Sequence, residues 1–368
     1  MLLVVHHDDC LAHDTGAGLF EAGPSPLIEV PEPHPESPGR LANIRSALER
    51  GPLAGELRWR EARPAGREAV ERIHSPRHVD RVAALSGLRG VTRIGDSSTF
   101  ASPRTPDAAL AAAGCALGAA DAVLDREAPY AYALARPPGH HAGPEAIDGY
   151  CFFNNAALAA QRALDRGAGR VAIVDWDVHH GNGTQACFWS CGEVLAISLH
   201  MDHRSWDPET HPERGLANEV GEGDGAGRNV NVALPLGGGD AAYAACFERV
   251  VAPALRAFAP DVLIGCAGQD ASQFDPNGRM SVSMEGFHAI GAAFGALAGE
   301  LCGGRAILVQ EGGYGPTYSA LCLLATLSGV LGRPTGVKDP LALYPDLETG
   351  HDAAISATLA AHAGLGLL

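Results

Sequence analysis

The chain has 368 residues and a formal net charge of −16, because 43 acidic residues outnumber 27 basic ones. This balance argues against nucleic acid as a partner, since phosphate binding needs clustered Lys and Arg, and no apolar run approaches the length of a membrane span. The length, the 46% hydrophobic fraction and an odd count of 9 cysteines without a secretory signal together predict one large enzyme domain in the reducing cytoplasm.

Short apolar runs alternate with longer helical patterns along the chain. The short runs predict strands at residues 2–5, 130–135, 171–174, 194–199, 230–234, 262–266 and 307–309. The longer patterns predict helices at residues 106–124, 154–166, 241–258, 284–301 and 317–331. Strand and helix in turn predict a mainly parallel sheet covered by helices on both faces, so we expect a single three-layer α/β domain over residues 1–368.

Residues 15–38 interrupt this alternation. The segment is rich in Pro and Gly, which predicts a long surface loop near the mouth of a site, although plain surface coil fits the same composition. It carries Glu21, Glu29, Glu32 and Glu36 without any Lys or Arg.

The segment 171–184, VAIVDWDVHHGNGT, predicts a metal site. Asp175, Asp177 and His179 follow an apolar strand at two-residue spacing, which places their side chains on one face. Carboxylates at the end of a buried strand need a compensating charge, and a second strand in DVLIGCAGQDAS delivers Asp270. Asp177, His179 and Asp270 with one open position predict catalytic zinc, although iron or cobalt suits the same ligands. Taken one at a time, an aspartate of this set could cap a helix and the histidine could be an ordinary hydrogen-bonded polar residue. This alternative does not explain the whole set.

Two further segments add groups that transfer protons. A strand ends in Arg-Pro-Pro-Gly before His140 and His141, which predicts proton transfer near neutral pH. Another strand ends in Gly-Gly before Tyr314, which predicts a phenol on a loop that the two glycines keep mobile. Together with a metal, these groups suit amide hydrolysis. For the histidine pair alone a buried turn is about as good an explanation, and a lone Gly-Gly-Tyr is more often just a turn.

Seven motifs occur along the chain in this order: HPESPGRL, RPPGHHA, GYCFFNNAA, DWDVHHGNGT, ISLH, GQDAS and EGGY. With these motifs the chain resembles the zinc-dependent deacetylases, which include class II histone deacetylases and bacterial acetylpolyamine amidohydrolases. The resemblance implies an arginase/deacetylase-like fold. It also implies that Asp177, His179 and Asp270 bind zinc, that His141 is the general base and that Tyr314 is the oxyanion donor.

The resemblance implies supporting roles as well. His140 would be the electrostatic partner of His141, Asp175 would orient His140, and Asn182 would orient His141 without adding charge. A monovalent cation, K⁺ or Na⁺, would be bound by Asp175, Asp177, His179, Ser198 and Leu199.

The chain departs from the family pattern around the substrate. We expect Gly149, Tyr150, His211 and Asn277 at the substrate pocket, with Asn277 placing an amide where the family often has an apolar residue. With the acidic loop 15–38, such a mouth favours a compact cationic amine, such as an acetylated polyamine, over a histone tail.

Other interpretations stay open. The substrate could be protein lysine, a polyamine or another small amide. The same fold also serves arginase-like hydrolases with two manganese ions, which would need more carboxylates around Asp177 and Asp270, and a third class is a non-catalytic binder of acylated lysine. The sequence does not give the oligomeric state, so a homo-oligomer stays open.

Overall fold

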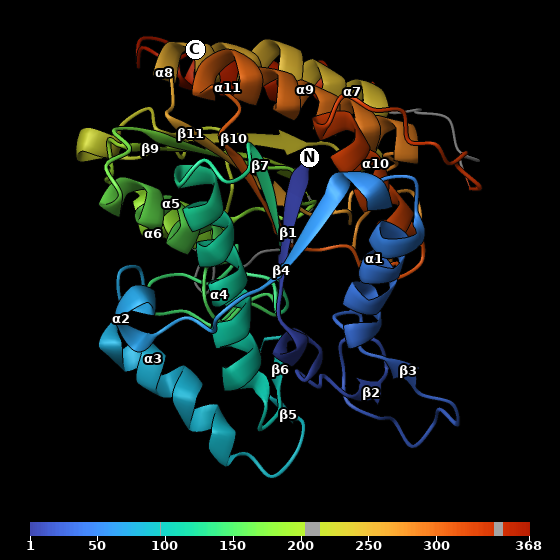
Figure 1. Ribbon diagram of the computed structural model, residues 1–368. Coiled ribbons are helices and arrows are strands. Elements are labelled where there is room, and N and C mark those ends of the chain that lie inside the picture. Colours follow the sequence, from blue (N-terminus) through green and yellow to red (C-terminus); the bar gives the residue numbers. More distant parts are fainter. Residues whose placement is uncertain (96, 203–213, 342–348) are drawn as a thin grey trace.

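The computed structural model describes residues 1–95, 97–202, 214–341 and 349–368. Its centre is an eight-stranded sheet of order β10-β9-β8-β11-β12-β7-β1-β4, in which every neighbouring pair is parallel (Figure 1). The strands are β1 (Leu2–His6), β4 (Leu57–Glu61), β7 (Tyr130–Leu134), β8 (Val171–Asp175), β9 (Val194–Met201), β10 (Asn229–Leu234), β11 (Val262–Ala267) and β12 (Ala306–Gln310). All seven expected strands are in this sheet, which confirms the predicted α/β class.

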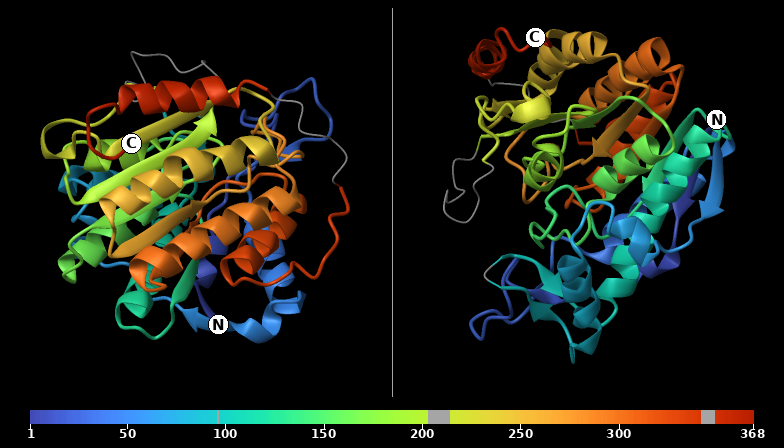
Figure 2. Two further views of the ribbon diagram at one scale, coloured as in Figure 1. Left: turned by 90° about the horizontal axis from the view of Figure 1, so that it is seen from above. Right: turned by 90° about the vertical axis from the view of Figure 1, so that its left-hand side faces the viewer.

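Helices cover both faces of the sheet (Figure 2). One layer holds α4 (Thr105–Leu124), α5 (Asn155–Asp165) and α6 (Asn182–Phe188), and the other holds α7 (Asp240–Cys246), α8 (Ala252–Phe258), α9 (Met284–Cys302), α10 (Tyr318–Val330) and α11 (His351–Ala361). A π-helical turn at Phe247–Val251 joins α7 to α8, so the single helix expected at 241–258 is irregular in the middle. The predicted three layers are confirmed.

Several elements lack a clear sequence signal. The edge strand β4 reads LRWRE, and its charged residues hide the strand pattern while they suit an unpaired sheet edge. The structure also contains α1 (Pro38–Arg50), which packs on α10, and two short helices, α2 (Arg67–Val70) and α3 (Pro76–Ala83). A small hairpin pairs β5 (Thr92–Arg93) with β6 (Phe100–Ala101).

Helix α4 corrects one expectation about apolar length. Its 20 residues are long and apolar enough to cross a membrane by length and composition. In the structure, α4 packs against α5, β7 and β1, and most of its residues are buried inside the protein. Helix α4 therefore has the burial of a core helix.

The segment 15–38 is mostly irregular, as expected, and extends away from the sheet in Figure 1. A short hairpin of β2 (Ala17–Gly18) and β3 (Glu32–Pro33) closes its base. The carboxyl ends of β7, β8, β11 and β12 lie at one edge of the sheet because these strands are parallel neighbours. The polar residues that follow these strands therefore meet at this edge.

Candidate active site

Asp177, His179 and Asp270 meet at the carboxyl ends of β8 and β11. His179 Nδ1 lies 3.2 Å from Asp177 Oδ1 and 3.1 Å from Asp270 Oδ2. Both carboxylates are fully buried, whereas the His179 side chain is 19% exposed. Potential ligand atoms of the three residues lie within 4.8 Å of one another, so they could hold a metal ion. The structure therefore brings together the three residues that the sequence predicts as metal ligands.

Backbone amides fix the outer oxygens of the two carboxylates. Gly312 N–H donates to Asp177 Oδ2 at 2.7 Å, and Val178 N–H donates to Asp270 Oδ1 at 2.8 Å. The backbone at Gly312 comes so close that a Cβ there would lie 2.1 Å from Asp270 Oδ2. Glycine is required at this position because of the close approach.

The charges at this centre need a cation. Burial and the negative charge of Asp177 raise the pKa of Asp270 to about 7. Burial alone would lower the pKa of His179, but Asp177 and Asp270 raise it to about 10. A proton on His179 thus offsets the two carboxylates when no metal is bound. A divalent cation fits the same place, because oxygen and nitrogen donors converge on it and it supplies the missing positive charge.

The histidine pair lies beside this centre with its rings 4.0 Å apart between centroids. His140 Nδ1 is 2.9 Å from Asp175 Oδ2, and His141 Nδ1 is 2.7 Å from Asn182 Oδ1. The two partners that the sequence predicts are therefore in place.

Burial and nearby charges separate the pKa values of the two histidines. Burial opposes a charge on His140, but Asp177 and Asp175 raise its pKa well above the usual value. Burial and the neighbouring charge of His140 lower the pKa of His141 well below the usual value. Since His141 donates its Nδ1 hydrogen to Asn182, the neutral ring carries its lone pair on Nε2, where a base accepts a proton.

Glu311 supports the histidine pair and is absent from the sequence prediction. Its Oε2 accepts hydrogen bonds from the backbone N–H of Gly139 at 2.6 Å and of His140 at 3.1 Å. Burial raises the pKa of Glu311 to about 8. The available signal is its position directly after strand β12, at the edge where the other site residues gather.

The Tyr314 loop is held by contacts on both sides. Asp275 Oδ2 accepts from the backbone N–H of Tyr314 at 2.6 Å and of Gly315 at 3.1 Å. Arg40 donates to Gly313 O at 2.6 Å, and its guanidinium lies 4.5 Å from the centroid of the Tyr314 ring. The glycines of this loop allow its backbone to pack closely against the carboxylates of Asp177 and Asp270.

Glu36 corrects a second expectation. Its side chain is fully buried, and Oε1 accepts from Arg40 Nη1 at 2.9 Å and from Arg136 Nε at 2.7 Å. Glu36 therefore neutralises buried guanidinium groups and adds no negative charge to the mouth. Glu36 is buried rather than exposed because it lies just before α1, four residues from Arg40.

The expected substrate residues lie around Tyr314 where they are described. The rings of Tyr150 and Tyr314 meet edge to face with centroids 5.4 Å apart, and Asn277 Nδ2 donates to the Tyr150 hydroxyl at 3.0 Å. A Cβ on Gly149, which has a φ of +47°, would lie 2.1 Å from His141 Cδ2. His211 lies outside the described residues.

Three of the residues expected to bind a monovalent cation lie on the neighbouring strands β8 and β9. Strand register pairs Asp175 with Ser198, and Leu199 follows in β9. Both side chains reach Gly181, since its N–H is 3.5 Å from Ser198 Oγ and a Cβ there would lie 2.6 Å from Asp175 Oδ2. Burial raises the pKa of Asp175, so a nearby cation would favour its charged form.

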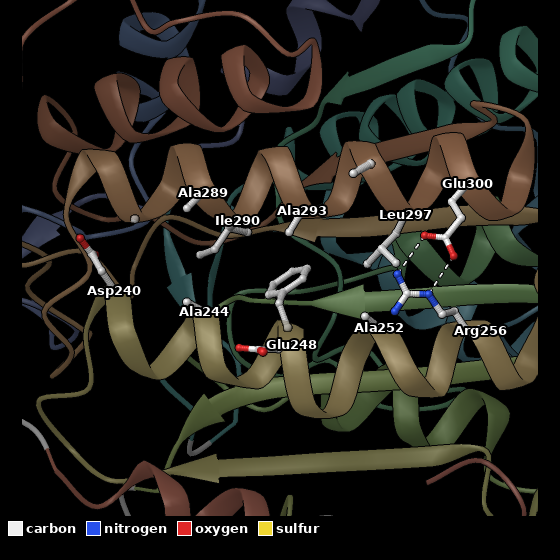
Figure 3. A pocket seen from close by; sticks show the side chains of 13 residues that line it. Asp240, Ala244, Glu248, Ala252, Arg256, Ala289, Ile290, Ala293, Leu297 and Glu300 are labelled. Atoms are coloured by element: carbon white, nitrogen blue, oxygen red, sulfur yellow. Dashed lines mark hydrogen bonds and ion pairs between the residues drawn. The ribbon is translucent and has the colours of Figure 1, made fainter.

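A large hollow lies elsewhere. Figure 3 shows a groove between α9 and the α7–α8 segment, lined by small and apolar side chains such as Ala244, Ile290 and Ala293. The volume of this groove is about 390 Å³. An ion pair of Arg256 with Glu300 closes one end. The lining contains none of the predicted site residues, so this groove is separate from the chemistry.

The chain is similar to known proteins over most of its length. The histone deacetylase domain family matches residues 34–330. Histone deacetylase 8 of Arabidopsis thaliana is 44% identical over 364 residues, which cover 98% of this chain and 96% of that protein. The histone deacetylase-like amidohydrolase of Pseudomonas aeruginosa is 39% identical over 342 residues, which cover 92% and 88%. The crystal structure of the HDA15 HD domain matches with a TM-score of 0.82 at 34% identity and covers 99% of this chain and 96% of that chain.

The family match and the relatives indicate an α/β hydrolase of the deacetylase or amidohydrolase type. The chain belongs to the histone deacetylase family, since the family match covers most of its length and both relatives match over almost the whole chain. The family resemblance expected from the sequence motifs is therefore confirmed.

A buried histidine near the site makes stability depend on pH. His74 is 1% exposed, and its Nδ1 lies 2.9 Å from Gly143 O while its Nε2 accepts from Asn154 N–H at 2.9 Å. Burial and the neighbouring His78 lower the pKa of His74 to about 3. His74 thus joins the two ends of the segment that carries Gly149 and Tyr150.

We expect His74→Gln to flatten the acid side of the stability curve. The unfolded chain binds a proton at His74 below about pH 6.5, whereas the folded protein does so only near pH 3. The contribution of neutral His74 to the free energy of unfolding is therefore fully present above pH 6.5, and it is lost as the pH falls towards 3. When the pH is lowered from 7.5 to 5.5, the free energy of unfolding of the wild type should fall by about 1 kcal/mol more than that of the variant, as measured by chemical denaturation. Equal losses in the two proteins would contradict this assignment.

Proposed function

We propose that this protein is a zinc-dependent amide hydrolase that removes an acetyl or related acyl group from an amine. The observation that carries the proposal is the convergence of Asp177, His179 and Asp270 beside a histidine pair of opposite pKa shifts. Asp177, His179 and Asp270 would hold the zinc. When bound there, zinc supplies Lewis-acid chemistry that polarises the amide carbonyl and activates water for attack.

The remaining steps belong to the side chains of the chain itself. Neutral His141 takes a proton from the attacking water, and Asn182 holds its ring in the tautomer that accepts it. Protonated His140 stabilises the negative charge that develops and is itself fixed by Asp175. Burial raises the pKa of Tyr314 well above its usual value, so its hydroxyl keeps its proton and donates to the carbonyl oxygen as that atom becomes negative. The proton on His141 then passes to the departing amine.

A monovalent cation, K⁺ or Na⁺, is part of the proposal. The Asp175 carboxylate and the Ser198 hydroxyl both reach Gly181, and Asp175 also binds His140. With Leu199 and the backbone of Asp177 and His179, they would supply the oxygen ligands that such an ion prefers. The ion would then act on catalysis through the charge of His140.

Two other classes are less well supported. A binuclear manganese hydrolase needs further carboxylates, and within residues 1–95, 97–202, 214–341 and 349–368 the one cluster of His, Cys, Asp and Glu with converging ligand atoms is Asp177, His179 and Asp270. A non-catalytic binder of acylated lysine needs no base and no oxyanion donor. In this chain His141, which is hydrogen-bonded to Asn182, and Tyr314, whose ring meets that of Tyr150, would supply both roles.

The first expected result is one zinc per chain. Purified protein analysed for metal content should contain one zinc ion per chain, and Asp177→Asn should remove both the metal and hydrolysis of an acetylated amine. The matched control is Asp8→Asn, which changes an exposed acid outside the site. Full activity of metal-free protein, or two tightly bound ions at this centre, would overturn the proposal.

Tyr314→Phe tests the oxyanion role. Loss of the hydroxyl should lower kcat about a hundredfold or more and leave KM nearly unchanged, since the donor acts mainly in the transition state. Tyr130→Phe is a suitable control, because Tyr130 lies at the start of β7 and so at the opposite edge of the sheet. A normal kcat with a raised KM would assign Tyr314 to substrate binding instead.

Replacing potassium by tetramethylammonium at constant ionic strength tests the monovalent site. Loss of the cation should change activity and shift the pH–rate profile, because Asp175 is shared between the ion and His140. Identical activity and identical pH profiles in the two salts would show that no such ion acts on catalysis.

A further inference from the structure

A tight turn of the backbone lies against the ring of His141. Asp148 and Cys151 exchange two backbone hydrogen bonds, of 3.2 and 2.7 Å, and so close this turn. Gly149 and Tyr150 at its tip have φ of +47° and +68°, and a type I′ turn requires a positive φ at both tip residues. The backbone of Gly149 packs on the ring, because a Cβ on Gly149 would lie 2.1 Å from His141 Cδ2.

The first residue of this turn, Asp148, contacts the hydrogen-bond partner of His141. Asn182 Oδ1 lies 2.7 Å from His141 Nδ1, and Asn182 Nδ2 donates to Asp148 Oδ2 at 3.4 Å. The contact with Asp148 is at the long end of hydrogen-bond distances. In the described part of the chain these two are the hydrogen bonds of the Asn182 side chain. Asn182 and His141 are buried, whereas Asp148 is partly exposed.

An amide by itself does not select the tautomer of a neighbouring imidazole. The oxygen and the NH2 group of Asn182 are similar in size, so the side chain fits the same space in two orientations. With the oxygen towards His141, the ring carries its hydrogen on Nδ1 and its lone pair on Nε2. With the NH2 group towards His141, the hydrogen is on Nε2, and this nitrogen cannot accept a proton. The orientation of Asn182 therefore decides whether His141 is a base at Nε2.

Asp148 removes this ambiguity. A carboxylate accepts hydrogen bonds and has none to donate, so it pairs only with the NH2 group of Asn182. The opposite orientation would place two acceptor oxygens against each other, one of them charged, at the edge of a buried site. With the NH2 group directed at Asp148, the amide oxygen is directed at His141.

We propose that Asp148 is a positioning residue, which fixes the amide of Asn182 and through it the tautomer of His141. The inference rests on the proposed amide hydrolysis, in which His141 is the base. Asp148 acts through Asn182 and not on the substrate. A negative charge one residue away from the base is thus used to set the direction of a hydrogen bond.

The ring nitrogens of His141 report the tautomer without any turnover. Nitrogen NMR of the metal-loaded wild type should show a protonated Nδ1 and an unprotonated Nε2. Asp148→Asn should add the other tautomer as a measurable fraction, because the new amide can either donate or accept. Glu145→Gln, which changes an exposed acid of the same segment, is the matched control and should keep the wild-type tautomer. An unchanged tautomer in Asp148→Asn would overturn the proposal.

Exchanging the two side chains tests the same point by turnover of a fluorogenic acetyl-lysine amide. Asp148→Asn alone should lower kcat about tenfold, the scale of one hydrogen bond to a charged group, with KM nearly unchanged. Asn182→Asp alone should also lower kcat, because two carboxylates would then face each other. In the background of Asn182→Asp, Asp148→Asn should instead raise kcat. The new amide then donates to the new carboxylate, which still accepts from His141 Nδ1.

Three other results have different meanings. An equal fall in kcat for Asp148→Asn in both backgrounds would contradict the positioning role, since Asp148 would then only shape the turn. A raised KM with a normal kcat would also contradict it and would assign Asp148 to substrate binding. If the wild type hydrolyses no acetylated amine, the proposed function fails, and the tautomer measurement still decides the role of Asp148.

Discussion

The candidate active site depends on two buried carboxylates, Asp177 and Asp270, that face a single imidazole. Like charges repel strongly in an interior of low dielectric constant, so this arrangement needs a positive charge at its centre. The N–H groups of Gly312 and Val178 stabilise one oxygen of each carboxylate and leave the others directed at His179. A bound cation would complete this balance, and the raised pKa of His179 shows how strongly the site favours positive charge.

The same requirement shapes the loops around the centre. The loop of Tyr314 must approach the carboxylates closely, and the backbone there has room only for glycine at position 312. Asp275 holds this loop from one side and Arg40 from the other, and Glu36 compensates the buried charge of Arg40. The phenol of Tyr314 is therefore positioned by groups from distant parts of the chain. This preorganisation suits a donor that acts on developing charge.

Sequence patterns are least informative where a residue's partner lies far along the chain. The composition of the loop 15–38 places Glu36 at an acidic mouth, but in the structure Glu36 is buried between two arginines, one of them 100 residues away. Glu311 has no motif that reveals its hydrogen bonds to the backbone of Gly139 and His140. The contact of Asp148 with Asn182 is likewise invisible in sequence, since 34 residues separate the partners.

The alternation of strand and helix follows from the amino-acid sequence alone. The choice of Asp177, His179 and Asp270 as candidate metal ligands also follows from it, because apolar runs that end in carboxylates recur along the chain. Parallel strands place their carboxyl ends at one edge, so the sequence is sufficient to group these residues. Which acids are buried, which loops are held and what surrounds Tyr150 are settled only by the tertiary fold. Burial and charge compensation depend on neighbours brought together by folding, and no local pattern records them.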